Sequence, residues 1–222
     1  GVIGLGPWLN RNEITVYVSS VSIFRHFIRS LDPTDRFPTV RAVRFASEPA
    51  AAADVCAWRH HFPNDGILLN TLSSSETGNI TRHRVDAEAF NNNERVPVGN
   101  AVEGIEILLL DEHGSVVTEN GAAGEIAVRS RFLSPGYWRN ETLTAEKFSG
   151  DDANGFRMFR TGDFARRAPD GSLVFMDRGD ARVKIRGYRI EISEIEDALT
   201  RMPGITAAIV CARAARDGEQ QL

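Results

Sequence analysis

The sequence predicts an α/β segment followed by an α+β segment. Up to about residue 70, apolar runs of strand length alternate with stretches of helical periodicity, the pattern of a parallel-sheet subdomain. Between residues 96 and 158, short strands follow one another without a long helical pattern, which predicts a small, mostly antiparallel β-subdomain. The expected divisions are residues 1–95 for the α/β subdomain, 96–177 for the β-rich subdomain, and 178–222 for a C-terminal α+β segment.

The first segment has the order strand, helix, strand, helix, strand. Its predicted strands are residues 14–18, 40–45 and 67–69. Apolar residues recur at helical spacing over 21–31 and 55–62, between those strands. Because each strand–helix–strand unit implies a parallel crossover, ligands are expected beyond the carboxyl ends of the strands. Residues 47–49 and 71–78 both lie at such ends.

The later segments are rich in strands joined by turns. The predicted strands are residues 104–110, 124–129, 164–167 and 173–176. Residues 111–114 and 169–171 carry the Asp and Gly that favour turns. Ser193 and Glu196 have the spacing of a capping box, which predicts a helix, and a strand is expected at 205–212.

Composition excludes several classes of protein. Hydrophobic content of 42% and charged content of 25% are typical of soluble globular domains, and the net charge of -4 indicates neither a nucleic-acid nor a membrane partner. The two cysteines, Cys56 and Cys211, fit a reducing compartment, so a cytoplasmic location is expected. No apolar run reaches the roughly 20 residues of a membrane helix. Residues 1–9 lack an initiator Met and a basic leader, so the chain is expected to begin inside a longer protein.

The chemistry is concentrated between residues 159 and 196. FRTGDF at 159–164 is followed by DRGD at 177–180 and by RVKIRGYRIE at 182–191. A carboxylate behind a Thr-Gly turn can accept hydrogen bonds from both ribose hydroxyls, and an Arg offers a forked donor to phosphate or sugar oxygens. The order of motifs resembles the signature of the adenylate-forming enzymes, which include acyl-CoA synthetases, luciferases and the adenylation domains of nonribosomal peptide synthetases. The resemblance covers essentially all 222 residues and is strongest to an amino-acid adenylation domain, in its central and hinge portion only.

The resemblance implies a nucleotide site for ATP. Asp163 takes the role of the ribose acceptor and Arg178, fifteen residues later, that of its partner. Taken alone, Asp163 could equally be a turn aspartate. Ser47 and Glu48 belong to the turn whose backbone lines the adenine pocket in the family, although Ala-Ser stands here where two glycines are common.

Residues 71–78 match the family segment that contacts phosphate and magnesium. By resemblance, the Ser75 hydroxyl contacts nucleotide phosphate and Glu76 ligates Mg²⁺, a metal that prefers hard oxygen donors. Read alone, the run could be a serine-rich surface loop. Leu72 replaces the aromatic residue on which adenine usually stacks, and Phe175 stands where the family often has an aromatic near adenine.

The resemblance also implies that residues 1–95 are the end of an N-terminal α/β subdomain, and that residues 178–222 are a hinge and a partial C-terminal subdomain that moves. Asp180 corresponds to the hinge, and Lys184 and Gly187 lie on the strand and loop that swing toward the acyl-adenylate for thioester formation. Gly187 would permit close approach of a pantetheine arm. Alternatively, Lys184 and its neighbouring arginines form a solvated cationic hairpin.

The resemblance defines the expected activity and its alternatives. A carboxylic acid, most simply an amino acid, is activated as acyl-adenylate and passed to a thiol on carrier-protein phosphopantetheine or coenzyme A. The alternatives are an acyl-CoA ligase and a non-catalytic interaction module with a degenerate adenylating fold. The family's phosphate loop and C-terminal lysine are expected outside these 222 residues, so the isolated chain is expected to be inactive and to self-associate through its incompletely covered sheet.

Overall fold

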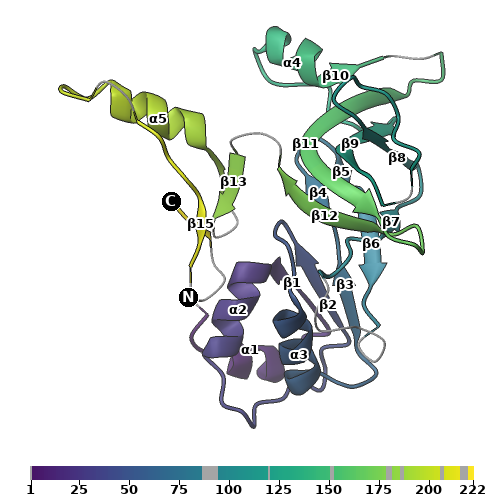
Figure 1. Ribbon diagram of the computed structural model, residues 1–222. Helices are drawn as coiled ribbons and strands as arrows, with labels where there is room; N and C mark the ends of the chain where they lie inside the picture. The colour runs from purple at the N-terminus through teal and green to yellow at the C-terminus, as the bar shows by residue number, and fades with distance from the viewer. Residues whose placement is uncertain are drawn as a thin grey trace.

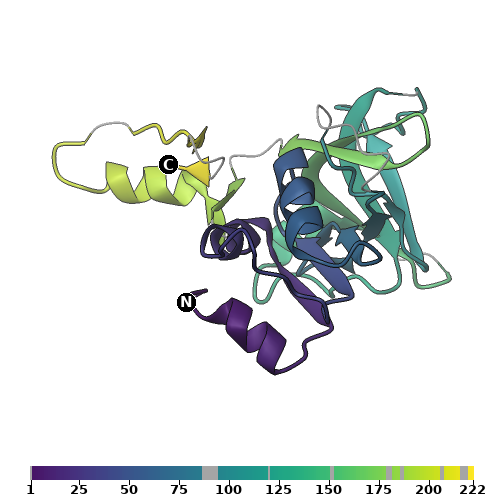
Figure 2. The ribbon, with the colours of Figure 1, turned by 90° about the horizontal axis from the view of Figure 1, so that it is seen from below.

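The protein consists of an α/β part, a β-rich part and a C-terminal hairpin with a helix (Figure 1). The computed structural model describes residues 2–86, 95–119, 121–150, 153–178, 182–185, 188–205, 208–215 and 220–222. Figures 1 and 2 both show the β8–β12 region and helix α5 on opposite sides of the molecule.

The α/β part is a sheet with helices. Its elements are α1 (Leu5–Arg11), β1 (Val16–Ser20), α2 (Val21–Arg29), β2 (Ala42–Ala46), α3 (Ala52–His61), β3 (Ile67–Asn70), β6 (Thr81–Arg84) and β7 (Asn100–Ala101). Strand β2 pairs in parallel with β1 and β3, as predicted, and β6 and β7 continue the sheet antiparallel. Ser20 caps α2 by accepting a hydrogen bond from the Ile23 amide at 3.4 Å. Helix α1 was not predicted from the sequence.

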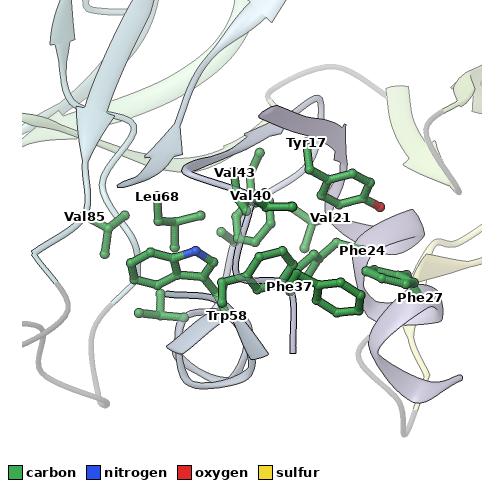
Figure 3. Close-up of a cluster of buried hydrophobic side chains, with 14 of the residues drawn as sticks. Tyr17, Val21, Phe24, Phe27, Phe37, Val40, Val43, Trp58, Leu68 and Val85 are labelled. Atoms are coloured by element: carbon green, nitrogen blue, oxygen red, sulfur yellow. The ribbon is translucent and has the colours of Figure 1, made fainter. Parts of the chain in front are cut away.

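Aromatic side chains cluster in the core of the α/β part, together with aliphatic ones (Figure 3). This first core contains Leu9, Tyr17, Val21, Phe24, Phe27, Phe37, Val40, Val43, Phe45, Ala50, Val55, Trp58, Phe62, Leu68, Val85 and Val96. It joins α2 and α3 to one face of the sheet, because alternate strand residues point to opposite faces. On β1 the other face is open: Val16 is 54% exposed and Val18 is 55% exposed.

The β-rich part is antiparallel, as predicted. It comprises β4 (Ser73–Ser74), β5 (Gly78–Asn79), β8 (Ile105–Leu110), β9 (Ala123–Ser130), α4 (Glu141–Lys147), β10 (Phe148–Ser149), β11 (Arg157–Arg167) and β12 (Leu173–Arg178). The strand order is β10-β11-β9-β8, and β12 also pairs with β11. Helix α4 begins where the Asn140 side chain accepts a hydrogen bond from the Leu143 amide at 3.0 Å.

A second core, largely aliphatic, joins the two parts. It contains Leu72, Ile80, Val98, Ile107, Leu109, Ile126, Val128, Ala165 and Leu173. Two backbone hydrogen bonds reinforce the junction, from Val98 to the Leu173 carbonyl at 2.8 Å and from Leu173 to the Gly99 carbonyl at 2.9 Å. At Gly99 the backbone has φ +87°, and an added Cβ would lie 2.2 Å from the Arg82 carbonyl oxygen, so glycine is required. The division at residue 95 stays a prediction.

The C-terminal part contains a hairpin and one helix. Its elements are β13 (Arg182–Ile185), β14 (Tyr188–Glu191), α5 (Ile192–Thr200), β15 (Arg213–Ala214) and β16 (Gln220–Gln221). The helix begins at Ile192, so Ser193 lies inside it rather than at its cap. The predicted strand at 205–212 is wrong for its described residues; Glu196 Oε1 instead accepts a hydrogen bond from the Val210 amide at 2.9 Å. Within the described ranges, no helix is long and apolar enough to span a bilayer.

Candidate nucleotide site

The turn after β2 is anchored to the start of α2. Glu48 Oε2 accepts hydrogen bonds from the Ser22 amide and hydroxyl, both at 2.6 Å. A carboxylate at this position complements the partial positive charge of a helix N-terminus. Ser47 has φ +71°, a conformation that favours glycine, which accounts for the glycines that are common here in the family. That this turn lines an adenine pocket stays a prediction.

The Ser75–Glu76 segment forms the tip of a hairpin. Strands β4 and β5 pair Ser73 with Asn79 and Ser74 with Gly78, so residues 75–77 form the loop between them. Ser75 is exposed at this tip, whereas Glu76 is buried. The structure thus presents a hydroxyl to solvent and holds the adjacent carboxylate inside.

A second loop, LSPGY at residues 133–137, holds Glu76, although the sequence alone favours a packing role for this segment. The Tyr137 hydroxyl donates to Glu76 Oε1 at 3.0 Å, and the Ser134 amide donates to the Glu76 carbonyl at 2.8 Å. Gly136 permits this loop, because its φ is +142° and a Cβ there would lie 2.4 Å from Thr144 Cγ2. The signal in the sequence was the Pro-Gly turn just before Tyr137.

The Glu76 carboxylate is a hard oxygen donor of the kind that Mg²⁺ prefers. Among the described residues, no group of three or more His, Cys, Asp or Glu could hold a metal by itself. Mg²⁺ is often bound through one or two carboxylates together with substrate phosphates. Glu76 therefore supplies the kind of ligand that such a shared ion needs.

Asp163 and Arg178 lie opposite each other on neighbouring strands. They are paired residues in the antiparallel ladder of β11 and β12, and Asp163 is buried. The Asp163 amide donates to Thr161 Oγ1 at 3.0 Å, which fixes the turn before the carboxylate. Glu125 on β9, which sequence reasoning did not place among the site residues, accepts a hydrogen bond from the Gly162 amide at 3.0 Å.

Leu72 and Phe175 belong to the same packed region. Leu72 is a buried member of the second core, and Phe175 packs against that core. Phe175 also borders a groove of about 830 Å³ lined by Arg95, Pro97, Arg166, Ala168, Pro169, Asp170, Ser172, Val174, Phe175 and Met176. The Arg95 guanidinium donates to the carbonyls of Phe175 and Met176, so it fixes β12 just before Arg178.

His83 on β6 and Asp170, which lines this groove, influence each other electrostatically. Burial lowers the pKa of His83 on β6 from its ordinary value, and the charge of Asp170 partly opposes this. Hydrogen bonds from the Ser172 hydroxyl and amide lower the pKa of Asp170, with a smaller contribution from His83. The neutral form of His83 is therefore favoured by burial.

The predicted hinge residues are placed only in part. Asp180 and Gly187 lie outside the described residues, and of Lys184 and Arg178 the backbone alone is described. Lys184 stands opposite Arg189 in the β13–β14 hairpin. Figure 1 shows β13 apart from strands β8, β9 and β11.

The fold and these motifs define an adenylate-forming class of protein. The family described as AMP-binding enzyme matches residues 7–138, more than half of the chain. The chain therefore belongs to the AMP-binding enzyme family, and the resemblance drawn from its motifs is confirmed.

The relatives include a carrier-protein ligase and a peptide synthase. The L-proline--[L-prolyl-carrier protein] ligase of Streptomyces coelicolor is 35% identical over 94% of this chain and 38% of its own length. Gramicidin S synthase 2 of Brevibacillus brevis is 33% identical over 96% of this chain and 5% of its own. The structure of PA1221, an NRPS protein containing adenylation and PCP domains, has a TM-score of 0.81 and 29% identity, covering 98% of this chain and 43% of that one. The chain thus spans less than half of each of these proteins.

Proposed function

We propose that this chain is the central and hinge portion of an ATP-dependent ligase that activates an amino acid and transfers it to a pantetheine thiol. The observation that carries this proposal is the pairing of buried Asp163 with Arg178 on adjacent strands. A buried carboxylate opposite a guanidinium-bearing residue is a suitable acceptor for ribose hydroxyls beside an anionic phosphate chain. The relatives named above support an amino-acid substrate and a carrier-protein partner.

In the first half-reaction, a carboxylate oxygen of the amino acid attacks the α-phosphorus of ATP. The bond from that phosphorus to the bridging oxygen breaks, and pyrophosphate leaves. Asp163 and its partner Arg178 would orient the ribose, and the Ser75 hydroxyl would donate to phosphate. Glu76 would hold Mg²⁺, whose charge offsets that of the phosphates.

In the second half-reaction, a thiolate sulfur attacks the acyl carbon and AMP leaves. Asp180 is the proposed hinge, and it would carry the strand of Lys184 and the loop of Gly187 toward the acyl-adenylate. The acceptor is proposed to be phosphopantetheine on a carrier protein, and coenzyme A is the alternative acceptor.

The test is amino-acid-dependent ATP–pyrophosphate exchange by the complete gene product that contains these 222 residues. A panel of amino acids, aryl acids and fatty acids identifies the substrate class. Exchange with at least one amino acid is expected, together with transfer to carrier pantetheine in preference to coenzyme A. Exchange with fatty acids alone would favour an acyl-CoA ligase, and no exchange with a folded protein would favour a non-catalytic module.

We propose that the isolated chain is catalytically inactive and that it self-associates. The test uses a reducing buffer, because the expected location is cytoplasmic. In the described part of the chain, β1 pairs with β2 alone and exposes Val16 and Val18 on its uncovered face. Light scattering should detect oligomers, and Val16→Lys with Val18→Lys should disperse them. A monomeric wild-type chain would contradict this proposal.

A further inference from the structure

The carboxylate of Asp163 is presented by a bulge in β11. Arg160 pairs with Ala127 and Phe164 pairs with Glu125, so residues 161–163 of β11 stand opposite Ile126 alone on β9. A bulge re-aims side chains but leaves backbone groups outside the regular ladder. Something other than the ladder must therefore fix this segment.

Glu125 binds the bulge with both of its carboxylate oxygens. Oε1 accepts a hydrogen bond from the Gly162 amide at 3.0 Å, and Oε2 accepts one from Arg160 Nε at 2.9 Å and another from Arg160 Nη2. Glu125 is only 7% exposed. The carboxylate thus joins the residue before the bulge to its central amide.

Thr161 completes the anchorage. Its hydroxyl donates to the Ile126 carbonyl at 2.8 Å and accepts from the Asp163 amide at 3.0 Å. Gly162 has φ +75°, which lets the chain turn between these two anchors. These hydrogen bonds join the bulge to β9 and to itself, so β9 sets where the bulge lies.

We propose that Glu125 is a positioning residue that sets the Asp163 carboxylate for the ribose hydroxyls of ATP. This inference rests on the proposed function. Glu125 acts on the Gly162 amide, one residue from Asp163, so its loss would let the carboxylate drift from the productive geometry. A displacement of about 1 Å from the productive geometry can lower the rate of a catalysed reaction about 100-fold, so small shifts of a positioned group matter.

The chain offers a matched control in the same sheet. Glu106 on β8 binds Arg129 on β9, with Arg129 Nη1 donating to Glu106 Oε2 at 2.8 Å. This pair has the same residue types but is exposed, with side-chain exposures of 39% for Arg129 and 51% for Glu106. Arg129 stands opposite Met158 on β11, before the bulge begins.

The experiment compares the binding of ATP with that of 2′,3′-dideoxy-ATP, which lacks the hydroxyls that Asp163 would bind. Dissociation constants are measured by calorimetry on the complete gene product as wild type, Glu125→Gln and Glu106→Gln. Glu125→Gln should weaken ATP about tenfold, the scale of one hydrogen bond to a charged group, and should leave dideoxy-ATP unchanged within about twofold. Glu106→Gln should change neither constant.

A second variant covers the case in which Glu125→Gln does not fold. The Arg160 side chain is 44% exposed, so Arg160→Gln should be tolerated while releasing one side of the Glu125 carboxylate. Arg160→Gln should also weaken the binding of ATP and leave the binding of dideoxy-ATP unchanged.

Three outcomes overturn the inference. Equal weakening of ATP and dideoxy-ATP binding would show that Glu125 has a general structural role. Unchanged ATP affinity in both variants would show that Glu125 does not position the site. If the wild type binds ATP and dideoxy-ATP equally well, the ribose hydroxyls contribute nothing to affinity. Asp163 would then not bind them, and the inference would fail. The proposed function fails separately, through the absence of acid-dependent exchange.

Discussion

The two cores of this protein differ in what they support. The first core, under the parallel strands, is built from rings such as Phe24, Phe45 and Trp58, and none of the candidate site residues belongs to it. The second core is aliphatic and includes Leu72, while Phe175 packs against it. One core thus holds the parallel strands together, and the other includes or contacts two of the candidate site residues.

This difference separates stability from nucleotide binding. A substitution in the first core should change the free energy of unfolding and leave the nucleotide site intact. A substitution in the second core should change both, because Leu72 and Phe175 share its packing.

The largest expected effect is on the first core. Phe24→Ala removes a fully buried ring that packs on Phe45 at a centroid distance of 4.6 Å, and should lower the free energy of unfolding by about 3–5 kcal/mol. Urea denaturation measures this loss. ATP affinity of the folded variant should equal that of the wild type, and a matching loss of affinity would show that the cores are not separable.

The next effect concerns the loop that holds Glu76. Tyr137→Phe removes the hydroxyl that binds Glu76 Oε1 and should raise the Mg²⁺ concentration needed for ATP binding by about 10–100-fold. Titration of Mg²⁺ or Mn²⁺ at fixed ATP, followed by calorimetry, measures it. Tyr188→Phe is the control, because Tyr188 is exposed on β14. An unchanged metal requirement in Tyr137→Phe would remove the tyrosine from the site.

A smaller effect is expected at Leu72. Leu72→Phe restores a ring where the family stacks adenine and should tighten ATP binding about fivefold, near the lower end of base stacking energies. Overpacking should lower stability by about 1–3 kcal/mol. Ile107→Phe, in the same core but outside the candidate site, should lower stability without tightening ATP. Equal nucleotide effects in both variants would contradict a role for Leu72 at the base.

The smallest expected effect is on the pH dependence of stability. The pKa of His83 is lowered in the folded protein, so as pH falls the unfolded chain binds a proton first, near pH 6.5. Stability should therefore fall as pH drops through 6.5 toward the folded pKa, and level off below it. His83→Gln should flatten this part of the plot of melting temperature against pH. If the variant keeps the slope of the wild type, other groups cause the pH dependence.

Local patterns predicted much of the fold. The strands near Val43, Leu68 and Ile107 and the helix from Val21 follow from apolar periodicity. Glu125 and Tyr137 could not be found this way, because their partners lie 37 and 61 residues away in the sequence. Helix α1 and the lack of a strand among the described residues of 205–212 show the same limit, since neighbours in space decide whether a short apolar run becomes strand or helix.

The central claim is that Asp163 binds the ribose of ATP. Calorimetry of ATP with Mg²⁺ on the complete gene product tests it in wild type, Asp163→Ala and Asp170→Ala, an exposed turn aspartate of the same sheet. Asp163→Ala should weaken ATP tenfold or more, since hydrogen bonds to a charged group contribute about 1.5–3 kcal/mol each, and Asp170→Ala should not. Equal ATP affinity in all three folded proteins would contradict the account.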